Sequence, residues 1–328
     1  MTDADVLVIG GSRFIGRHTV EALHDAGYDV TTFNRGNHDH PFGSAVDHVE
    51  GDRREDDDLR AARDAVGPDA VVDCVAYSPR DVRVACEVFA DVEGYVFVSS
   101  GAAYGAERVP KREGETALHP CSDEQATDDT WETYGNRKAE GDREVFRAAE
   151  RGVNAMSLRP PIVYGPHDYT ERFDYWVDRV DGADRVLVPG DGTNLRHLVY
   201  VADVADAVVT LLDRGDPGEA YNVGDDHLPT LGEWVDRIAD ACGSHPEVVH
   251  AGERELDAGD LTHEEFPLYR PYPHVLDTTK LRDLGWRSTP HEVAVAETVE
   301  HVRERGFEGE RGPEREAEAR VLDILETM

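Results

Sequence analysis

A tyrosine and a lysine four residues apart, Tyr134 and Lys138, are the residues of this chain most suited to joint chemistry. If the segment is helical, the two side chains lie on one face. A free phenol has a pKa of about 10, and a neighbouring ammonium stabilises its ionised form. The chain has only three lysines in 328 residues, so a lysine at this spacing is not expected by chance. The pair therefore predicts a tyrosine that acts as a base near neutral pH.

A serine lies at the end of an apolar run, residues 95–100, that predicts a buried strand. The hydroxyl of Ser100 can hydrogen-bond a substrate oxygen and hold it against a base. A serine that merely ends a strand has the same pattern, so Ser100 becomes a candidate only together with Tyr134 and Lys138.

A glycine-rich turn near the N-terminus indicates a phosphate site. Apolar residues 6–9 predict a buried strand, Gly10, Gly11 and Gly16 follow it, and residues 15–26 predict a helix. The unpaired N–H groups and the dipole of a helix N-terminus favour an anion, and glycine lets the anion come close. Arg13 stands where a G-x-x-G-x-x-G turn has its middle glycine. From this turn alone, an ordinary strand–turn–helix corner remains the alternative.

The first half of the chain alternates strands with helices. Further strands are expected at 29–35, 46–51, 70–76, 95–100 and 153–160, with helices at 60–66 and 81–91. This rhythm predicts an α/β fold, a Rossmann-type doubly wound parallel sheet whose ligand lies at the carboxyl ends of the strands.

The acidic stretch 104–130 is expected to be a solvated loop, with a functional lid as the alternative. Asp129 and Glu132 resemble a capping box and predict a long helix over 130–151. Helices are expected further on at 169–180, 202–212, 231–242 and 291–305, with strands at 185–188, 197–201, 220–224 and 247–250.

We expect a cofactor-binding domain of residues 1–165, to which residues 195–225 return. A smaller C-terminal α/β substrate-binding domain would comprise 166–194 and 226–306, followed by a charged tail, 307–328, in which 314–325 can form a short helix.

Composition limits the function classes. The 69 acidic and 34 basic residues give a formal charge of −35, which is typical of a halophilic, haloarchaeal protein; a mesophilic acidic protein is the alternative. This charge disfavours nucleic-acid binding. Four scattered cysteines without C-x-x-C spacing indicate a reducing compartment. With no signal peptide or spanning run, we expect a cytoplasmic protein without a membrane segment.

Motifs of other enzyme classes do not occur. The sequence has no G-x-x-x-x-G-K-[ST] of P-loop ATPases, no G-x-S-x-G of hydrolases and no H-E-x-x-H of zinc proteases. His38-Asp39-His40 is expected to be a polar loop rather than a metal site, and no metal is predicted.

In its motifs the chain resembles the extended short-chain dehydrogenase/reductases, the NAD-dependent epimerase/dehydratase family. The landmarks are residues 10–16, 51–52, 99–105, Tyr134 with Lys138, 159–166, 196–203, 221–224 and 277–280. The G-x-x-R-F-I-G turn is similar to that of a branch with epimerases, reductases and chloroplast stem-loop RNA-binding proteins.

The resemblance implies roles for individual residues. Tyr134 would be the general acid/base, Lys138 would bind the nicotinamide ribose, and Ser100 would orient the reacting hydroxyl or carbonyl. Arg196 would clamp a substrate phosphate. The implied cofactor contacts, besides Tyr134 and Lys138, are Gly10, Gly11, Arg13, Phe14, Ile15, Gly16, Asn34, Arg35, Asp52 (to adenine), Arg53 and Ala76.

Departures from the family pattern refine this expectation. Gly101-Ala102 replaces the Asp-Glu of 4,6-dehydratases, which disfavours that reaction, and Ile162 replaces an asparagine that contacts the sugar nucleotide. Strand 29–35 ends in Asn34-Arg35 instead of an acid for the ribose hydroxyls, and Arg13 is a second arginine nearby. We therefore expect NADP as the preferred cofactor, with NAD as the alternative.

The sequence thus predicts an NAD(P)-dependent epimerase or reductase of a small molecule, possible substrates including a nucleotide sugar. One alternative is a regulatory or RNA-associated protein of the same fold without turnover, and another is a reductase of small aromatic substrates. A homodimer through the helix that bears Tyr134 is what the family implies.

Overall fold

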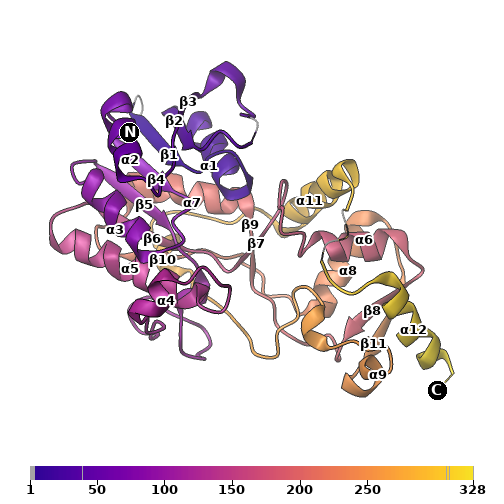
Figure 1. The fold of residues 1–328 in the computed structure, drawn as a ribbon. Coiled ribbons are helices and arrows are strands. Elements are labelled where there is room, and N and C mark those ends of the chain that lie inside the picture. Colours follow the sequence, from indigo (N-terminus) through magenta and orange to yellow (C-terminus); the bar gives the residue numbers. More distant parts are fainter. Residues whose placement is uncertain (1–3, 39, 308, 310, 328) are drawn as a thin grey trace. The chain divides into compact units, whose positions relative to one another are not determined.

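The computed structural model describes residues 4–38, 40–307, 309 and 311–327 (Figure 1), so Asp39 of the His38-Asp39-His40 loop lies outside the described residues. The chain divides into two compact units. Unit 1 comprises the residues up to Pro161 together with Val201–Gly224 and Leu276–Ser288. Unit 2 comprises Ile162–Tyr200, Asp225–Val275 and the residues from Thr289 on.

Unit 1 is built on a seven-stranded parallel sheet, which confirms the predicted α/β doubly wound fold. Its order is β10-β6-β5-β4-β1-β2-β3. The strands are β1 (Asp5–Ile9), β2 (Asp29–Asn34), β3 (Asp47–Glu50), β4 (Ala70–Asp73), β5 (Gly94–Val98), β6 (Ala155–Arg159) and β10 (Ala220–Asn222). Neighbours run in register, for example Val8 opposite Thr32 and Val72. As predicted, the strand near residue 220 returns to this sheet, beside β6.

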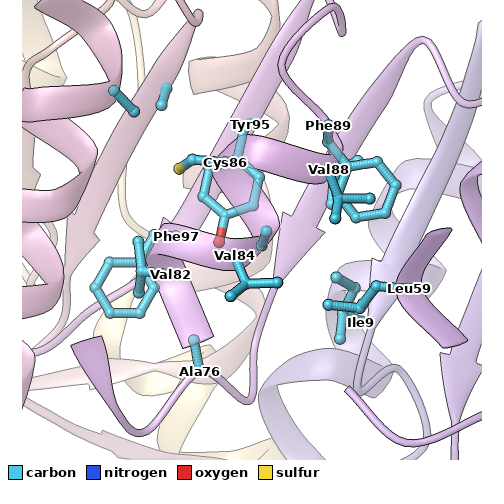
Figure 2. Packing of buried hydrophobic residues seen from close by; sticks show 14 of the residues in the cluster. Ile9, Leu59, Ala76, Val82, Val84, Cys86, Val88, Phe89, Tyr95 and Phe97 are labelled. Carbon is cyan, nitrogen blue, oxygen red and sulfur yellow. The ribbon is translucent and has the colours of Figure 1, made fainter. Parts of the chain in front are cut away.

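Helices cover both faces of the sheet, which explains why β4 and β5 are buried along their whole length. Alternate residues of a strand point to opposite faces. On one face, Ile9 packs near Leu59, and Phe97 packs near Val82 (Figure 2). That face carries α2 (Asp56–Val66), α3 (Pro79–Val88) and α5 (Tyr134–Glu150). On the other, α1 (Phe14–Asp25) packs against α7 (Val201–Arg214).

The predicted capping box before α5 is wrong. The helix begins at Tyr134, and Thr133 in the N-cap position makes no side-chain capping bond. Thr130 instead donates its N–H to Asp128 Oδ1 at 3.0 Å, and its carbonyl accepts a 2.7 Å bond from Arg137. These bonds hold the residues before Tyr134 in a turn outside the helix.

The expected solvated loop over 104–130 is wrong for its central part. Tyr104, Lys111 and Thr116 are buried. Lys111 forms an isolated parallel bridge with Leu276, and the Lys111 carbonyl accepts a 2.9 Å bond from the Asp277 N–H. The short helices η2 (Gly101–Ala103) and α4 (Asp123–Thr127) flank this part. Acidic composition alone did not reveal that the stretch is anchored.

Unit 2 contains two parallel strand pairs, β7 (Ile162–Tyr164) with β9 (Leu198–Tyr200) and β8 (Arg185–Pro189) with β11 (Glu247–Ala251). Its helices are α6 (Asp174–Gly182), α8 (Leu231–Cys242), α9 (Glu253–Asp257), α11 (His291–Arg305) and α12 (Arg315–Glu326). Among the residues that the structure covers, no helix combines the length and apolarity needed to cross a membrane.

The last helix of unit 2 is fixed by a buried carboxylate. Glu318 of α12 is 6% exposed and accepts bonds of 2.8 and 3.0 Å from Arg179 Nε and one of 2.8 Å from the Tyr175 hydroxyl. Both partners lie on α6. The charged C-terminal segment therefore belongs to the core of unit 2.

Removing this carboxylate should destabilise the protein. Glu318→Ala leaves the buried Arg179 with Asp178 as its remaining carboxylate partner and the Tyr175 hydroxyl without its acceptor, and we expect a loss of about 3 kcal/mol in the free energy of unfolding. Chemical denaturation at fixed salt measures it. Glu316→Ala, at an exposed position of the same helix, is the control and should change stability by less than about 0.5 kcal/mol. Equal unfolding free energies for the two variants would contradict the assigned role.

Candidate active site

Lys138 is a buried cation of unit 1. It is 2% exposed, and its Nζ donates to the Ala76 carbonyl at 2.9 Å and to the Val98 carbonyl at 2.8 Å. Both carbonyls lie at the carboxyl ends of neighbouring strands, since Val98 ends β5 and Ala76 follows β4. Burial lowers the pKa of Lys138 to about 8, and the charges of Asp73 and Asp142 oppose this shift.

Tyr134 is the first residue of α5, one turn before Lys138, and its ring centre lies 5.8 Å from Lys138 Nζ. The next residue, Gly135, brings this end of the helix against the loop that follows β5. A Cβ on Gly135 would lie 2.6 Å from the Ala102 carbonyl oxygen, which only glycine avoids. Ser100 starts this loop, and its Oγ accepts a 3.1 Å bond from the Ala102 N–H. Tyr134, Lys138 and the Ser100 loop therefore come together at the carboxyl end of the sheet.

The glycine turn after β1 has the geometry of a phosphate cradle. Gly10 has a φ of +91°, which L side chains rarely adopt. A Cβ on Gly16 would lie 2.1 Å from the Gly10 carbonyl oxygen, so the turn and the first turn of α1 touch through their backbones. Phe14 and Ile15 are the first residues of α1 and lie at the positive end of its dipole. Such a turn admits a phosphate at the helix N-terminus.

The remaining sequence-predicted contacts follow β2 and β3. Asn34 ends β2 and donates a 2.8 Å bond to Ser12 Oγ of the glycine turn. Arg13 and Arg35 are exposed, and Asp52 is partly buried just beyond β3. A carboxylate from β3 also reaches this region, because a Cβ on Gly36 would lie 3.2 Å from the carboxyl carbon of Glu50. The absence of an acid at the end of β2 is thus partly offset by an acid on its neighbour.

Arg53 does not join this group. It is 8% exposed, hydrogen-bonds Asp73, and forms an ion pair of 3.0 Å with Asp81 Oδ1. Arg53 is therefore the buried counterion of these two carboxylates, and a contact with the cofactor stays a prediction.

Arg196, in unit 2, is a buried arginine within a positive cluster. It is 4% exposed, and its Nε is buried with no hydrogen-bond partner among the described residues. Burial, together with the charges of Arg270 and Arg172, lowers the pKa of Arg196 to about 9. A buried guanidinium in such a field is stabilised by an anion.

The sequence did not single out several residues that shape these sites. Arg172 and Arg270 surround Arg196, but arginines far apart in the sequence carry no signal that they meet. Trp131 stacks on Tyr134, with ring centres 4.7 Å apart and ring planes 13° apart. Its position three residues before Tyr134 could have indicated from the sequence that the two rings lie close together.

The chain is similar to proteins of a known family. Residues 6–224 match the NAD dependent epimerase/dehydratase family. The chain is 26% identical over 306 residues to the chloroplast stem-loop binding protein of 41 kDa b of Arabidopsis thaliana, covering 87% of this chain and 75% of that protein. It is 29% identical over 315 residues to the low-salt glycan biosynthesis protein Agl12 of Haloferax volcanii, covering 86% and 93%.

Among solved structures, the UDP-glucose 4-epimerase of Thermus thermophilus in complex with NAD superposes with a TM-score of 0.69 at 26% identity. The superposition covers 91% of this chain and 99% of that one. The relatives therefore include an enzyme that acts on a nucleotide sugar and binds NAD.

The lowered pKa of Lys138 can be measured without an activity assay. A protein labelled with ¹³C at the lysine Cε has three signals, from Lys111, Lys138 and Lys280. One signal should titrate at about pH 8, as an ammonium below this pH and a free amine above it, and should vanish in Lys138→Arg. If all three signals titrate only near the ordinary lysine pKa of about 10.4, the described burial is contradicted.

Proposed function

Because the chain belongs to the NAD dependent epimerase/dehydratase family, we propose that it transfers hydride between a nicotinamide dinucleotide and a carbinol or carbonyl carbon of a nucleotide sugar. The observation that carries this proposal is the buried ammonium of Lys138 beside Tyr134. An ammonium buried beside a phenol stabilises the phenolate more strongly than an exposed one would, because little water screens the two charges.

The dinucleotide fits the residues that would hold it. The turn from Gly10 to Gly16 has no room for a Cβ on Gly16, which would lie 2.1 Å from the Gly10 carbonyl oxygen, and it leads into the N-terminus of α1, which suits a phosphate; Asn34 ties this turn to the end of β2. Lys138 would bind the ribose next to the nicotinamide. When bound, the dinucleotide supplies the carbon that accepts and returns hydride.

The protein's own residues would handle the proton. Ser100 holds the reacting oxygen by a hydrogen bond, and Tyr134 removes the hydroxyl proton as hydride leaves the carbon. Lys138 lowers the cost of the phenolate. Return of hydride to the other face of the carbon gives an epimerase, and release of the oxidised or reduced product gives a dehydrogenase or reductase. Gly101-Ala102 after Ser100 argues against a dehydratase.

The arginine cluster favours a substrate that carries phosphate. Arg196, with Arg172 and Arg270 near it, suits a diphosphate, because each phosphate brings negative charge and several acceptor oxygens. A small uncharged aromatic substrate would offer no anionic oxygen to the buried Nε of Arg196.

A second candidate function, an RNA-associated protein without turnover, is favoured by the similarity to the Arabidopsis stem-loop binding protein. The formal charge of −35 opposes it, since contacts with a nucleic-acid backbone rely on clustered basic residues. We therefore place catalysis first.

For the cofactor we propose NADP over NAD. The exposed arginines at positions 13 and 35 would pair with a 2′-phosphate, and the carboxylate of Glu50 near Gly36 would weaken that preference.

Removing the buried arginine should weaken substrate binding selectively. In Arg196→Leu we expect the KM for nucleotide sugars to rise by about 10- to 100-fold, the value of one or two charged hydrogen bonds. The free energy of unfolding should not fall, because the Arg196 side chain is buried and its Nε has no hydrogen-bond partner among the described residues. Arg254→Leu, an exposed change in the same unit, is the control. An unchanged KM, or a marked loss of stability, would count against a phosphate site.

Cofactor choice is tested by dinucleotide fluorescence at one fixed salt concentration, since salt screens exposed charges. Arg35→Ala should raise the Kd for NADPH by about fivefold, as expected for one exposed ion pair of about 1 kcal/mol, and leave that for NADH unchanged. Glu50→Gln should lower the Kd for NADPH. Arg54→Ala, an exposed change just beyond Asp52, should change the Kd of neither dinucleotide. If Arg35→Ala weakened the binding of NADPH and of NADH by the same factor, the proposed preference for NADP would be contradicted.

A further inference from the structure

The outer side of Tyr134 carries an exposed tryptophan. Trp131 is 74% exposed, whereas the other three tryptophans of the chain, at positions 176, 234 and 286, are at most 2% exposed. Its indole nonetheless lies parallel to the Tyr134 ring, with ring centres 4.7 Å apart and planes 13° apart. This separation and orientation are those of an offset stack of aromatic rings.

The position of Tyr134 explains what the stack does. A helical side chain normally packs over the turn that precedes it, and that turn limits its rotamers. Tyr134 is the first residue of α5, so no helical turn precedes it. Instead, the indole of Trp131, three residues earlier, lies against the phenol ring.

The backbone beneath the indole is fixed from inside the protein. Arg137, 4% exposed, donates 2.7 Å bonds to the carbonyls of Thr130 and Tyr77, and its Nε bonds Thr133 Oγ1 at 3.2 Å. Tyr134 also donates its N–H to the Trp131 carbonyl at 3.2 Å. The turn that carries the indole is therefore held to the helix that carries the phenol.

We propose that Trp131 is the positioning residue of Tyr134: its stacked indole keeps the phenol in the one orientation in which it exchanges a proton with the substrate. The proposal rests on the proposed function, because it concerns the residue assigned as general acid/base. Lys138 stabilises the phenolate, and Trp131 fixes where that phenolate lies.

The first test separates positioning from folding. Trp131→Ala should lower kcat by about tenfold or more, because a displaced catalytic group loses rate steeply, while the Kd of the dinucleotide changes by less than about twofold. Trp131→Phe keeps a stacking ring and should recover most of kcat. Glu132→Ala, at the exposed neighbouring position of the same turn, should match the wild type. A wild-type kcat in Trp131→Ala, or no recovery in Trp131→Phe, overturns the proposal.

The second test needs no substrate. The emission of Trp131 is isolated as the difference between the wild type and Trp131→Phe, since the other tryptophans are buried. Contact with the phenol predicts that this emission changes with pH as one proton leaves Tyr134, and that the change is absent in Tyr134→Phe. The same titration in Tyr134→Phe would overturn the stack. Full turnover in Tyr134→Phe would instead refute the proposed function. The fluorescence titration would still show whether Trp131 stacks on Tyr134.

Discussion

The ammonium of Lys138, held by two carbonyl oxygens at the carboxyl ends of β4 and β5, is the interaction on which the rest of the site depends. Burying an ammonium is costly, and here the cost is visible as a pKa lowered to about 8. Two backbone hydrogen bonds and the fields of Asp73 and Asp142 offset part of it. The bonds also tie α5 to the sheet, because one side chain of the helix donates to a carbonyl of β5 and to one that follows β4.

From this anchor the neighbouring features follow. Fixing Lys138 places Tyr134 one turn earlier, and Gly135 then has to lie against the Ala102 carbonyl, which brings the Ser100 loop to the same place. Parallel strand order sends the glycine turn, Asn34 and Asp52 to the same end of the sheet. The phosphate-binding and proton-handling residues of unit 1 thus share one edge because every strand of its sheet runs the same way.

Much of this could be predicted from the sequence, and the successes share a cause. Apolar runs and helical periodicity depend on burial, so the strands of the main sheet and the helices over 231–242 and 291–305 were predicted where they occur. The errors arose where tertiary hydrogen bonds, and not the local sequence, determine the conformation of a segment. Arg137 and Asp128 hold the turn before α5 out of the helix, and Lys111 anchors an acidic stretch that composition described as solvated. Likewise, nothing in the sequence showed that Arg53 would form ion pairs with Asp73 and Asp81.

The central claim is that Tyr134 exchanges a proton as hydride passes between substrate and dinucleotide, and single-turnover absorbance tests it most directly. The wild-type protein, loaded with oxidised dinucleotide and mixed with a panel of nucleotide sugars, should show reduced nicotinamide with at least one sugar. Tyr134→Phe, loaded to the same extent, should show none. Equal formation of reduced nicotinamide in the two proteins, or none in the wild type with any nucleotide sugar, would contradict the account.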